Sequence, residues 1–249
     1  MSLRFSATQK LQRTANLPQS TNFTICGWAR RRADRGTYST LCSVELTTSS
    51  KFIAYQTNTN GDSLVVFTDL ANGGTIATLT NDTWFFWAIT CSGTGSNNVT
   101  YYFALATATS LSSVTTSSSN YAPNQVNIGD DSFTEQWNGN MQNVIMYSGV
   151  LTSAQLLAQM RRSIPLFGTN LNIYSPLLST ADETIDYSGN GRNWTKTGTF
   201  TTEDSAPIVS PFQGRTKGRK QVVVSTTAKF RKTFSGIGTG IGKRQMMRS

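Results

Sequence analysis

The sequence predicts an all-β sandwich with one short helix, followed by an extended basic C-terminal arm. Short runs of apolar and β-branched residues recur through the first 212 residues, and turns rich in Gly, Asn, Ser and Thr separate them. Only 14% of the 249 residues are charged, which disfavours a coiled coil or a mostly helical protein. The last 37 residues differ from the rest, because they hold ten Lys and Arg and no acidic residue.

The predicted strands alternate in polarity along the chain. In FTICGWAR, Phe23 and Ile25 face one side, whereas Cys26 and Trp28 face the other. TWFFWAITCSG is apolar on both faces, so we expect it to lie centrally, with both sides covered. Asn-Gly-Asp at 60–62 predicts a hairpin between the runs on either side of it. The other predicted strands are LRFSA, TYSTLCSVEL, KFIAYQT, SLVVFTD, VTYYFALATA, QVNIGDD, NMQNVIMYS, LNIYSPLL and WTKTGTF.

One helix is predicted, at LTSAQLLAQMRR. Thr152 is a suitable N-cap and Gln155 follows it by three residues, which is the spacing of a capping box. Leu151 can also pack against Leu156 across the first turn. The helix is therefore expected over residues 153–161.

Residue types and segments that the sequence lacks exclude several classes of site. The chain has no histidine, so catalytic triads and zinc sites that depend on histidine are excluded. Its three cysteines, Cys26, Cys42 and Cys91, are an odd number without CxxC spacing and are predicted to be buried free thiols. No apolar run reaches the roughly 18 to 20 residues that cross a bilayer, and the start lacks the apolar run of a secretory signal. We therefore expect a soluble chain that begins at Met1 and has no membrane partner.

Charge divides the chain at residue 212. Residues 1–212 hold 12 Lys and Arg and 13 Asp and Glu, whereas residues 213–249 carry all of the excess positive charge. Within this arm, QVVVSTTAKF at 221–230 alternates like a strand, and such a strand is normally completed by pairing with a sheet edge. We therefore favour an arm that anchors on a partner protein; the alternatives are an arm that binds nucleic acid and a solvated tail. The basic residues of the arm are Arg215, Lys217, Arg219, Lys220, Lys229, Arg231, Lys232, Lys243, Arg244 and Arg248.

Five segments follow one another within residues 3–160: FTICGWAR, TWFFWAITCSG, YYFALA, VNIGDD and WNGNMQNVIMYSGVLTSAQLLAQM. Their order resembles the laminin G-like and pentraxin-like branch of the concanavalin A-like lectin/glucanase superfamily. The last of them, WNGNMQNVIMYSGVLTSAQLLAQM, is similar to the stretch that closes the family's domain. The resemblance implies a concanavalin A-like jelly-roll sandwich over residues 1–212, in which 163–212 resembles an extension seen beside such domains in phage-like and bacterial proteins. The matching positions are Phe23, Thr24 and Trp28; Trp84, Ala88 and Thr90; Ile128 and Gly129; and Trp137, Gly139, Met141, Val144, Tyr147 and Leu151.

Two departures from this family bear on function. Many members carry Asp where this chain has Gln142, so one acidic contribution to a family-like site is missing. The glucanase branch acts through a Glu-x-Asp-x-x-Glu strand, and no such run exists among the 13 acidic residues. A glycoside hydrolase is therefore disfavoured, and its candidate acids would be Glu45 or Glu135.

Candidate binding residues follow from residue type and position. Asp130 and Asp131 come directly after a predicted strand, where carboxylates can collect around Ca²⁺; the alternative is that both are solvated turn residues. Trp137 and Trp194 lie beside turns and are the better candidates for exposed rings that stack on sugars, whereas Trp28, Trp84 and Trp87 are predicted to be core residues.

A basic stretch at Arg30, Arg31, Arg32 and Arg35 is predicted to form a loop, either solvated or facing a phosphate or an acidic partner.

These observations favour a non-enzymatic virion structural protein, made in the host cytoplasm without a signal peptide. It would be a phage capsid-decoration or tail-associated subunit that displays a lectin-like sandwich and is anchored by its basic arm. The arm is expected to contact other virion proteins of an oligomeric assembly, or packaged nucleic acid. The alternative function is a carbohydrate-binding lectin module that recognises a cell-surface glycan. No cofactor is expected, with Ca²⁺ as the one candidate.

Overall fold

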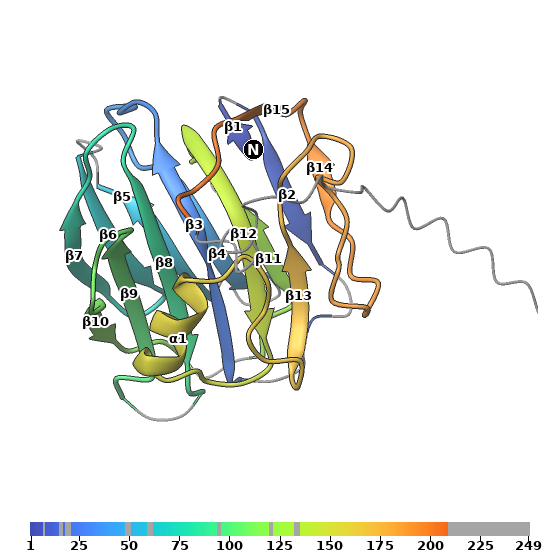
Figure 1. Ribbon diagram of the computed structural model, residues 1–249. Coiled ribbons are helices and arrows are strands. Elements are labelled where there is room, and N and C mark those ends of the chain that lie inside the picture. Colours follow the sequence, from blue (N-terminus) through green and yellow to red (C-terminus); the bar gives the residue numbers. More distant parts are fainter. Residues whose placement is uncertain are drawn as a thin grey trace, which may run out of the picture. The chain divides into compact units, whose positions relative to one another are not determined.

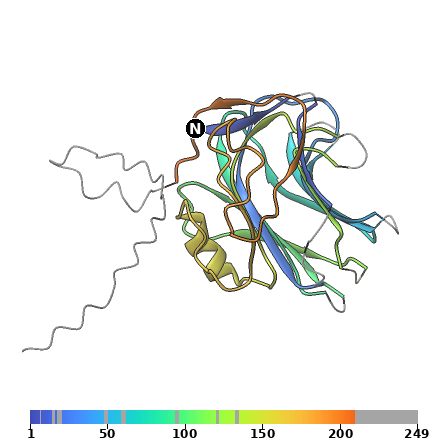
Figure 2. The same cartoon turned by 90° about the vertical axis from the view of Figure 1, so that its right-hand side faces the viewer.

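The computed structural model describes residues 1–208 apart from 7, 15–16, 18–20, 48–50, 59–61, 94–95, 120–121 and 132–134. It confirms the all-β prediction, because two antiparallel sheets pack face to face and the described residues form one short helix, α1, beside them (Figures 1 and 2). The chain divides into two units between residues 213 and 214. The ten basic residues predicted to anchor the arm all lie outside the described residues.

The first sheet, called sheet A, has eight strands. Its order is β10-β9-β8-β3-β12-β1-β15, and β13 pairs with β12 beside this path. The predicted central strand is β8, which lies between β3 and β9. The strands of sheet A are β1 (Ser2–Phe5), β3 (Phe23–Arg31), β8 (Trp84–Cys91), β9 (Val99–Leu105), β10 (Ser112–Thr116), β12 (Gly139–Tyr147), β13 (Leu171–Ser175) and β15 (Thr201–Glu203).

The second sheet, called sheet B, has seven strands in the order β14-β2-β11-β4-β5-β6-β7. β5 and β6 pair antiparallel on either side of the predicted Asn-Gly-Asp turn, which confirms that hairpin, although the turn itself lies partly outside the described residues. The strands of sheet B are β2 (Lys10–Arg13), β4 (Thr40–Leu46), β5 (Lys51–Thr57), β6 (Ser63–Thr68), β7 (Asn72–Thr78), β11 (Gln125–Ile128) and β14 (Thr195–Thr197).

Two apolar clusters cover the two faces of sheet A. The larger lies between the sheets and takes Phe23 and Ile25 from β3, whereas the smaller lies on the outer face and takes Cys26 and Trp28. This is the two-sided alternation that the sequence predicts for FTICGWAR. All three cysteines are buried and free, as predicted.

The helix α1 (Ser153–Met160) packs on the outer face of sheet A (Figures 1 and 2). The hydroxyl of Thr152 accepts from the backbone N–H of Gln155, and the Gln155 side chain accepts from the backbone N–H of Thr152, so the predicted capping box is present. Leu151 and Leu156 both join the outer apolar cluster. Among the described residues, no helix is long and apolar enough to cross a membrane.

The predicted final strand WTKTGTF, residues 194–200, contains the short strand β14, and a further strand that was not predicted, β15, follows it at Thr201–Glu203. β14 pairs with β2 in sheet B, and β15 pairs with β1 in sheet A. Between them Gly198 has a φ of +78°, and Phe200, 3% exposed, packs edge-on against Phe5 with 4.9 Å between ring centroids. The chain therefore crosses from one sheet to the other and closes this side of the sandwich with an aromatic ring.

After β15 the chain passes over the outer face of sheet A (Figure 1). The backbone N–H of Ala206 donates to the side-chain oxygen of Gln142 in β12 at 2.6 Å. Ala206 is buried in the outer apolar cluster, and Ile208 packs against that cluster. The hydroxyl of Ser2 also donates to the carbonyl of Asp204 at 2.6 Å, and the N-terminal ammonium donates to the hydroxyl of Ser205, so hydrogen bonds and apolar contacts hold the last described residues.

Candidate functional site

The two tryptophans predicted to bind sugars are buried. Trp137 is 0% exposed and Trp194 is 5% exposed, so the prediction that their rings are exposed is wrong. A side chain at Gly139 would place its Cβ 2.4 Å from the indole nitrogen of Trp137, so the glycine leaves room for that ring. The indole N–H of Trp194 donates to the hydroxyl of Ser175 at 2.6 Å. Both rings turn inward because the ends of the sandwich need large side chains to fill them.

Asp130 and Asp131 are also buried, at 5% and 2% exposed, so they are not solvated turn residues. Gly129, with a φ of +82°, turns the chain at the end of β11 and directs the next residues inward. One oxygen of Asp131 accepts from the hydroxyl of Thr40 at 2.7 Å and from the amide of Gln56 at 2.8 Å. The aspartates therefore belong to a hydrogen-bonded network at one end of sheet B.

Glu135 joins this network, which we call the acidic rim: Thr40, Gln56, Asp131 and Glu135. The amide of Gln56 donates to the Glu135 carboxylate at 2.6 Å as well as to Asp131. Burial and the charge of Asp131 raise the pKa of Glu135 to about 7. Glu135 is only partly buried, unlike its partners, so the acidic rim has one side chain that reaches solvent.

A second polar network continues across the outer face of sheet B. We call it the polar row: Gln12, Ser43, Glu45, Gln125 and Asn127. The register places Asn127 opposite both Gln12 and Ser43, and Gln125 opposite Glu45. Their neighbours along β2, β4 and β11, such as Leu11, Val44 and Val126, point into the core between the sheets. Strand alternation therefore puts the five polar side chains on the opposite, outer face.

Glu45 is the centre of the polar row. Its carboxylate accepts from the hydroxyl of Ser43 at 2.6 Å, the amide of Asn127 at 2.9 Å and the amide of Gln125 at 3.0 Å. Gln12 donates in turn to the side-chain oxygen of Asn127 at 2.9 Å. Glu45 is 5% exposed and Asn127 is 0% exposed, whereas Gln12 is partly exposed. A ligand would thus meet the row at its Gln12 end and the acidic rim at Glu135.

From the sequence, Asp131, Glu135 and Glu45 are separate candidates, but the two networks that bring them together with Thr40, Gln56 and the other polar residues were not predicted. The polar residues alternate visibly in TLCSVEL and QVNI, which is the signal that could have found them. The strand order of sheet B, which brings β2, β11 and β4 side by side, is the information that the sequence lacks.

The residues near Asp130 do not fit a calcium site. Ca²⁺ takes six to eight oxygen ligands. Here the oxygen of Asp131 that faces Thr40 and Gln56 already accepts two hydrogen bonds, and Asp130 accepts from the backbone N–H of Asp131 at 2.8 Å. In the part of the chain that the structure describes, no group of three or more Asp, Glu, Cys or His could hold a metal ion.

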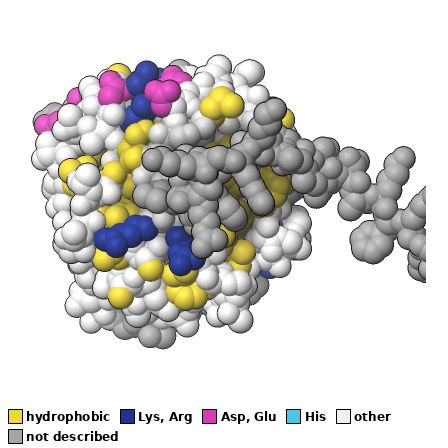
Figure 3. All heavy atoms as spheres, in the orientation of Figure 1, with side chains coloured by type: hydrophobic (Ala, Val, Ile, Leu, Met, Phe, Trp, Pro, Cys, Tyr) yellow, Lys and Arg dark blue, Asp and Glu magenta, His cyan; other side chains and the backbone are white. Residues whose placement is uncertain are grey.

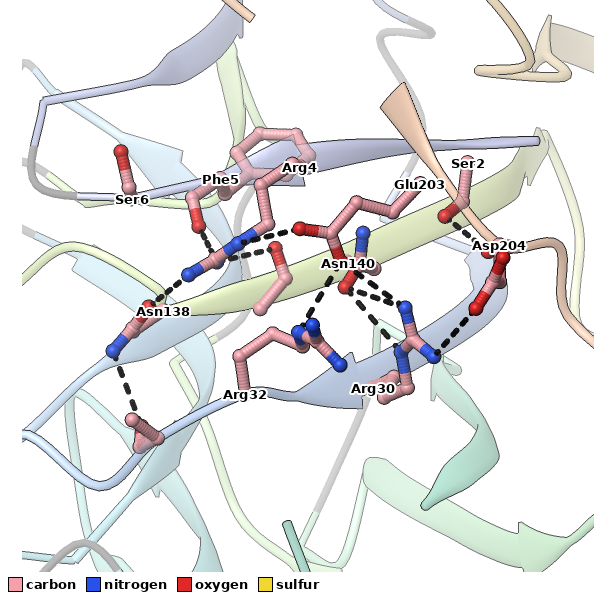
Figure 4. A network of polar contacts seen from close by, with 12 residues as sticks. Ser2, Arg4, Phe5, Ser6, Arg30, Arg32, Asn138, Asn140, Glu203 and Asp204 are labelled. Atoms are coloured by element: carbon pink, nitrogen blue, oxygen red, sulfur yellow. Dashed lines mark hydrogen bonds and ion pairs between the residues drawn. The ribbon is translucent and has the colours of Figure 1, made fainter. Parts of the chain in front are cut away.

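The predicted basic loop begins inside β3, which holds Arg30 and Arg31, and Arg30 and Arg32 belong to a partly buried charge network (Figure 4). Arg30 and Arg31 are only 6% and 5% exposed, so for these two the prediction of a loop is wrong. The carboxylate of Glu203 in β15 forms ion pairs with three guanidinium groups, with N–O distances of 3.5 Å to Arg4, 3.2 Å to Arg30 and 3.2 Å to Arg32. One carboxylate therefore ties β15 to β1 and β3, just before the chain crosses the outer face of sheet A.

Two hollows in the described surface are small. One, of about 220 Å³, lies beside α1 between Tyr147 and Phe167, and the other, of about 100 Å³, lies between Leu79 and Phe103. Pockets that enclose a small molecule usually measure roughly 300 to 1,000 Å³. Each of these two hollows is therefore smaller than a typical small-molecule pocket.

The two sheets define a β-sandwich whose sheet B carries the polar row on its outer face. A sequence model of the concanavalin A-like lectin/glucanase superfamily matches residues 5–157, and the chain belongs to that superfamily. No curated protein sequence matches the chain.

Solved structures share the fold at low identity. A candidate carbohydrate-binding protein from Bacteroides ovatus superposes with a TM-score of 0.59 at 18% identity, over 83% of this chain and 60% of the other. A heptameric SAP-like pentraxin from Limulus polyphemus gives 0.50 at 13% identity, over 82% and 92%. Tailspike protein 2 of a bacteriophage of Escherichia coli O157:H7 gives 0.51 at 13% identity, over 71% of this chain and 26% of the tailspike. This chain thus spans about 60% of the first of these proteins and a quarter of the tailspike.

Proposed function

We propose that the chain is a non-enzymatic structural subunit of a virion, either a capsid-decoration or a tail-associated protein. Its lectin-like sandwich would be displayed outward and its basic arm would anchor it to the particle. The observation that carries this proposal is the division of charge: residues 1–212 are nearly neutral, and residues 213–249 hold ten basic residues and no acid. A free lectin has no need of such a segment, whereas an assembly arm uses it to meet acidic partner surfaces or packaged genome.

The described fold is compatible with an anchoring role because its last residues are held to the sandwich. The three arginine contacts to Glu203 hold β15, and Gln142 holds Ala206, only a few residues before the described chain ends. The end of the described chain is therefore connected to β1, β3 and β12. The fold shared with a phage tailspike is compatible with this reading.

Deletion of residues 213–249 tests the proposal. The shortened chain is expected to fold, since the sandwich and its charge network lie upstream, and to lose attachment to the particle. Thermal melting would establish that it folds, and sedimentation with the particle would measure attachment. A folded deletion variant that still attaches would refute the anchoring role of the arm.

A second candidate function is glycan binding by the sandwich. The polar row and the acidic rim favour it, because hydroxyl, amide and carboxylate groups side by side can exchange hydrogen bonds with sugar hydroxyls. The similarity to a candidate carbohydrate-binding protein supports the same reading.

A glycan array with the full chain tests this second function. Saturable binding that the free sugar competes away, and that falls in Gln12→Ala and Glu135→Ala, is expected if these exposed ends contact the glycan. Tyr187→Ala, at an exposed position outside the polar row and the acidic rim, is a suitable control. Binding that both site variants leave unchanged would place the glycan elsewhere, and no saturable signal would leave the sandwich an architectural module.

A further inference from the structure

We propose that β10, the outer strand of sheet A, is a self-association edge that pairs antiparallel with β10 of a second copy of this chain. Edge strands present a row of unpaired backbone groups, and natural proteins protect them with charges, bulges, short length or a covering loop. The edges of this sandwich can be compared on that basis.

Three of the edges carry protection. β13 is covered by the segment that follows it: Asn190 donates to the carbonyls of Leu171 and Asn172, and the Asp186 carboxylate accepts from the N–H of Tyr174. β15 carries Glu203 with its arginine partners. β14 has only three residues, and its central side chain is the lysine of the ion pair to Glu183.

β7, the outer strand of sheet B, is protected by irregularity. Its pairing with β6 shifts register twice, and Gly74 has a φ of +87°. Bulges of this kind bend an edge and disrupt a regular ladder. β7 is therefore a poor template for a further strand.

β10 has none of these protections. Ser112–Thr116 pairs with β9 in continuous register, and no charged residue occurs anywhere from Thr83 to Gly129. Within the described residues, no backbone hydrogen bond reaches these five residues from outside the β9 ladder. β7 of the facing sheet approaches β10 at Thr116, where a Cβ at Gly73 would lie 3.3 Å from the Thr116 Cβ, and Thr116 shares the inward face of Val114.

β10 itself carries no charged side chain, whereas Asp69 lies just beyond its end and accepts hydrogen bonds from Ser118 and Ser119. Figure 3 shows blue and magenta atoms together at the top of this face and two further blue patches near its middle, inward of the flank where Figure 1 places β10. Leu105, at the end of the adjacent strand β9, is 45% exposed. Ile76 and Val114 are only partly buried against the core. The flank thus offers apolar contacts beside a free strand edge.

The sequence of β10 favours a second copy as the occupant. An antiparallel pair centred on Val114 places Val114 opposite itself, Ser112 opposite Thr116, and Ser113 opposite Thr115. Each pair is apolar or a Ser–Thr pair, and both kinds stabilise a sheet when they lie directly opposite. The basic arm is a poorer occupant, because β10 offers it no acidic side chain. Five residues make a short contact, so we expect a weak, concentration-dependent dimer.

A cysteine at the predicted twofold axis tests the pairing. Residues directly opposite in an antiparallel pair have Cα atoms about 4.5 to 5.5 Å apart, which a disulfide can bridge. We expect full-length Val114→Cys to form a linked dimer under mild oxidation. The native cysteines should give no background because all three are buried. Thr195→Cys, exposed on the protected edge β14, is the matched control and should stay monomeric. Linking of Val114→Cys no faster than that of Thr195→Cys would overturn the proposal.

A charge variant and a deletion distinguish the occupants. In Val114→Cys, adding Ser113→Lys and Thr115→Lys would set lysines opposite each other and should slow linking at least tenfold. Both side chains are exposed, so melting should confirm an intact fold. Unchanged linking would refute the pairing through β10. Removal of 213–249 should leave linking intact, whereas its loss would make the arm the occupant and overturn a copy-to-copy edge. Particle attachment, which tests the proposed function, is measured separately and does not depend on this result.

Discussion

The pH dependence of stability gives a sharp test of the acidic rim. Burial and the charge of Asp131 raise the pKa of Glu135 from 4.5 to about 7. Between these two values the folded state binds more protons than the unfolded state, so the free energy of unfolding must fall as the pH rises. The stabilisation is complete below about pH 4.5, decreases through pH 7 and is absent above it.

The magnitude follows from the same pKa. Each pH unit between the two values corresponds to about 1.4 kcal/mol, which sets a ceiling of roughly 3.4 kcal/mol. Glu135 is partly exposed and water screens its repulsion from Asp131, so we expect a loss of roughly 1 to 2 kcal/mol between pH 4.5 and 8. The chain has no histidine, so few other groups titrate in this window.

Urea unfolding followed by tryptophan fluorescence at pH 5, 6, 7 and 8 measures this loss. Glu135→Gln keeps an amide that can hydrogen-bond to Asp131 but cannot ionise, so its stability should stay nearly flat over the range. Asp186→Asn is a suitable control, because backbone N–H groups that donate to Asp186 lower the pKa of its carboxyl and keep its titration below the window. The reasoning is refuted if wild type and Glu135→Gln differ by the same amount at pH 5 and pH 8.

Three further predictions concern stability. Phe200→Ala is expected to lower the free energy of unfolding in urea by about 3 to 5 kcal/mol, because it leaves a cavity where the ring packs against Phe5. A loss below about 1 kcal/mol would contradict this packing role. Gly129→Ala is expected to lower the melting temperature, because its φ is +82° and its Cβ would lie 2.2 Å from the Phe5 ring, and an unchanged melting temperature would argue against that turn. Addition of calcium or of EDTA is expected to leave the melting temperature unchanged, and a rise with calcium would show that the Asp130 region rearranges to bind it.

The features that could be predicted from the sequence, such as strand faces and the start of the helix, depend on residues close together in the chain. Alternation in β3 separated Phe23 and Ile25 from Cys26 and Trp28 because period two is a property of any strand. The helix start at Thr152 was predictable because a capping box involves residues only three apart.

What the sequence could not predict depends on contacts between distant residues. Trp137 and Trp194 lie beside turns, but whether such a ring faces solvent or the core depends on which sheet covers it. Arg30 was predicted as a loop residue because its partner is distant in sequence. The carboxylate that pairs with it belongs to Glu203 in β15, 173 residues later. The polar row likewise requires the order of three strands that are separated in sequence by other elements.

The most direct test of the virion proposal is limited trypsin digestion of the protein from its native source after a density gradient, beside the same chain expressed alone. Ten basic residues among the last 37 offer trypsin many sites whenever the arm is accessible. We expect the native protein to sediment with a large particle and to keep its arm, whereas the lone chain is cleaved near Arg215. A native protein that stays small and loses its arm at once would contradict the anchoring role.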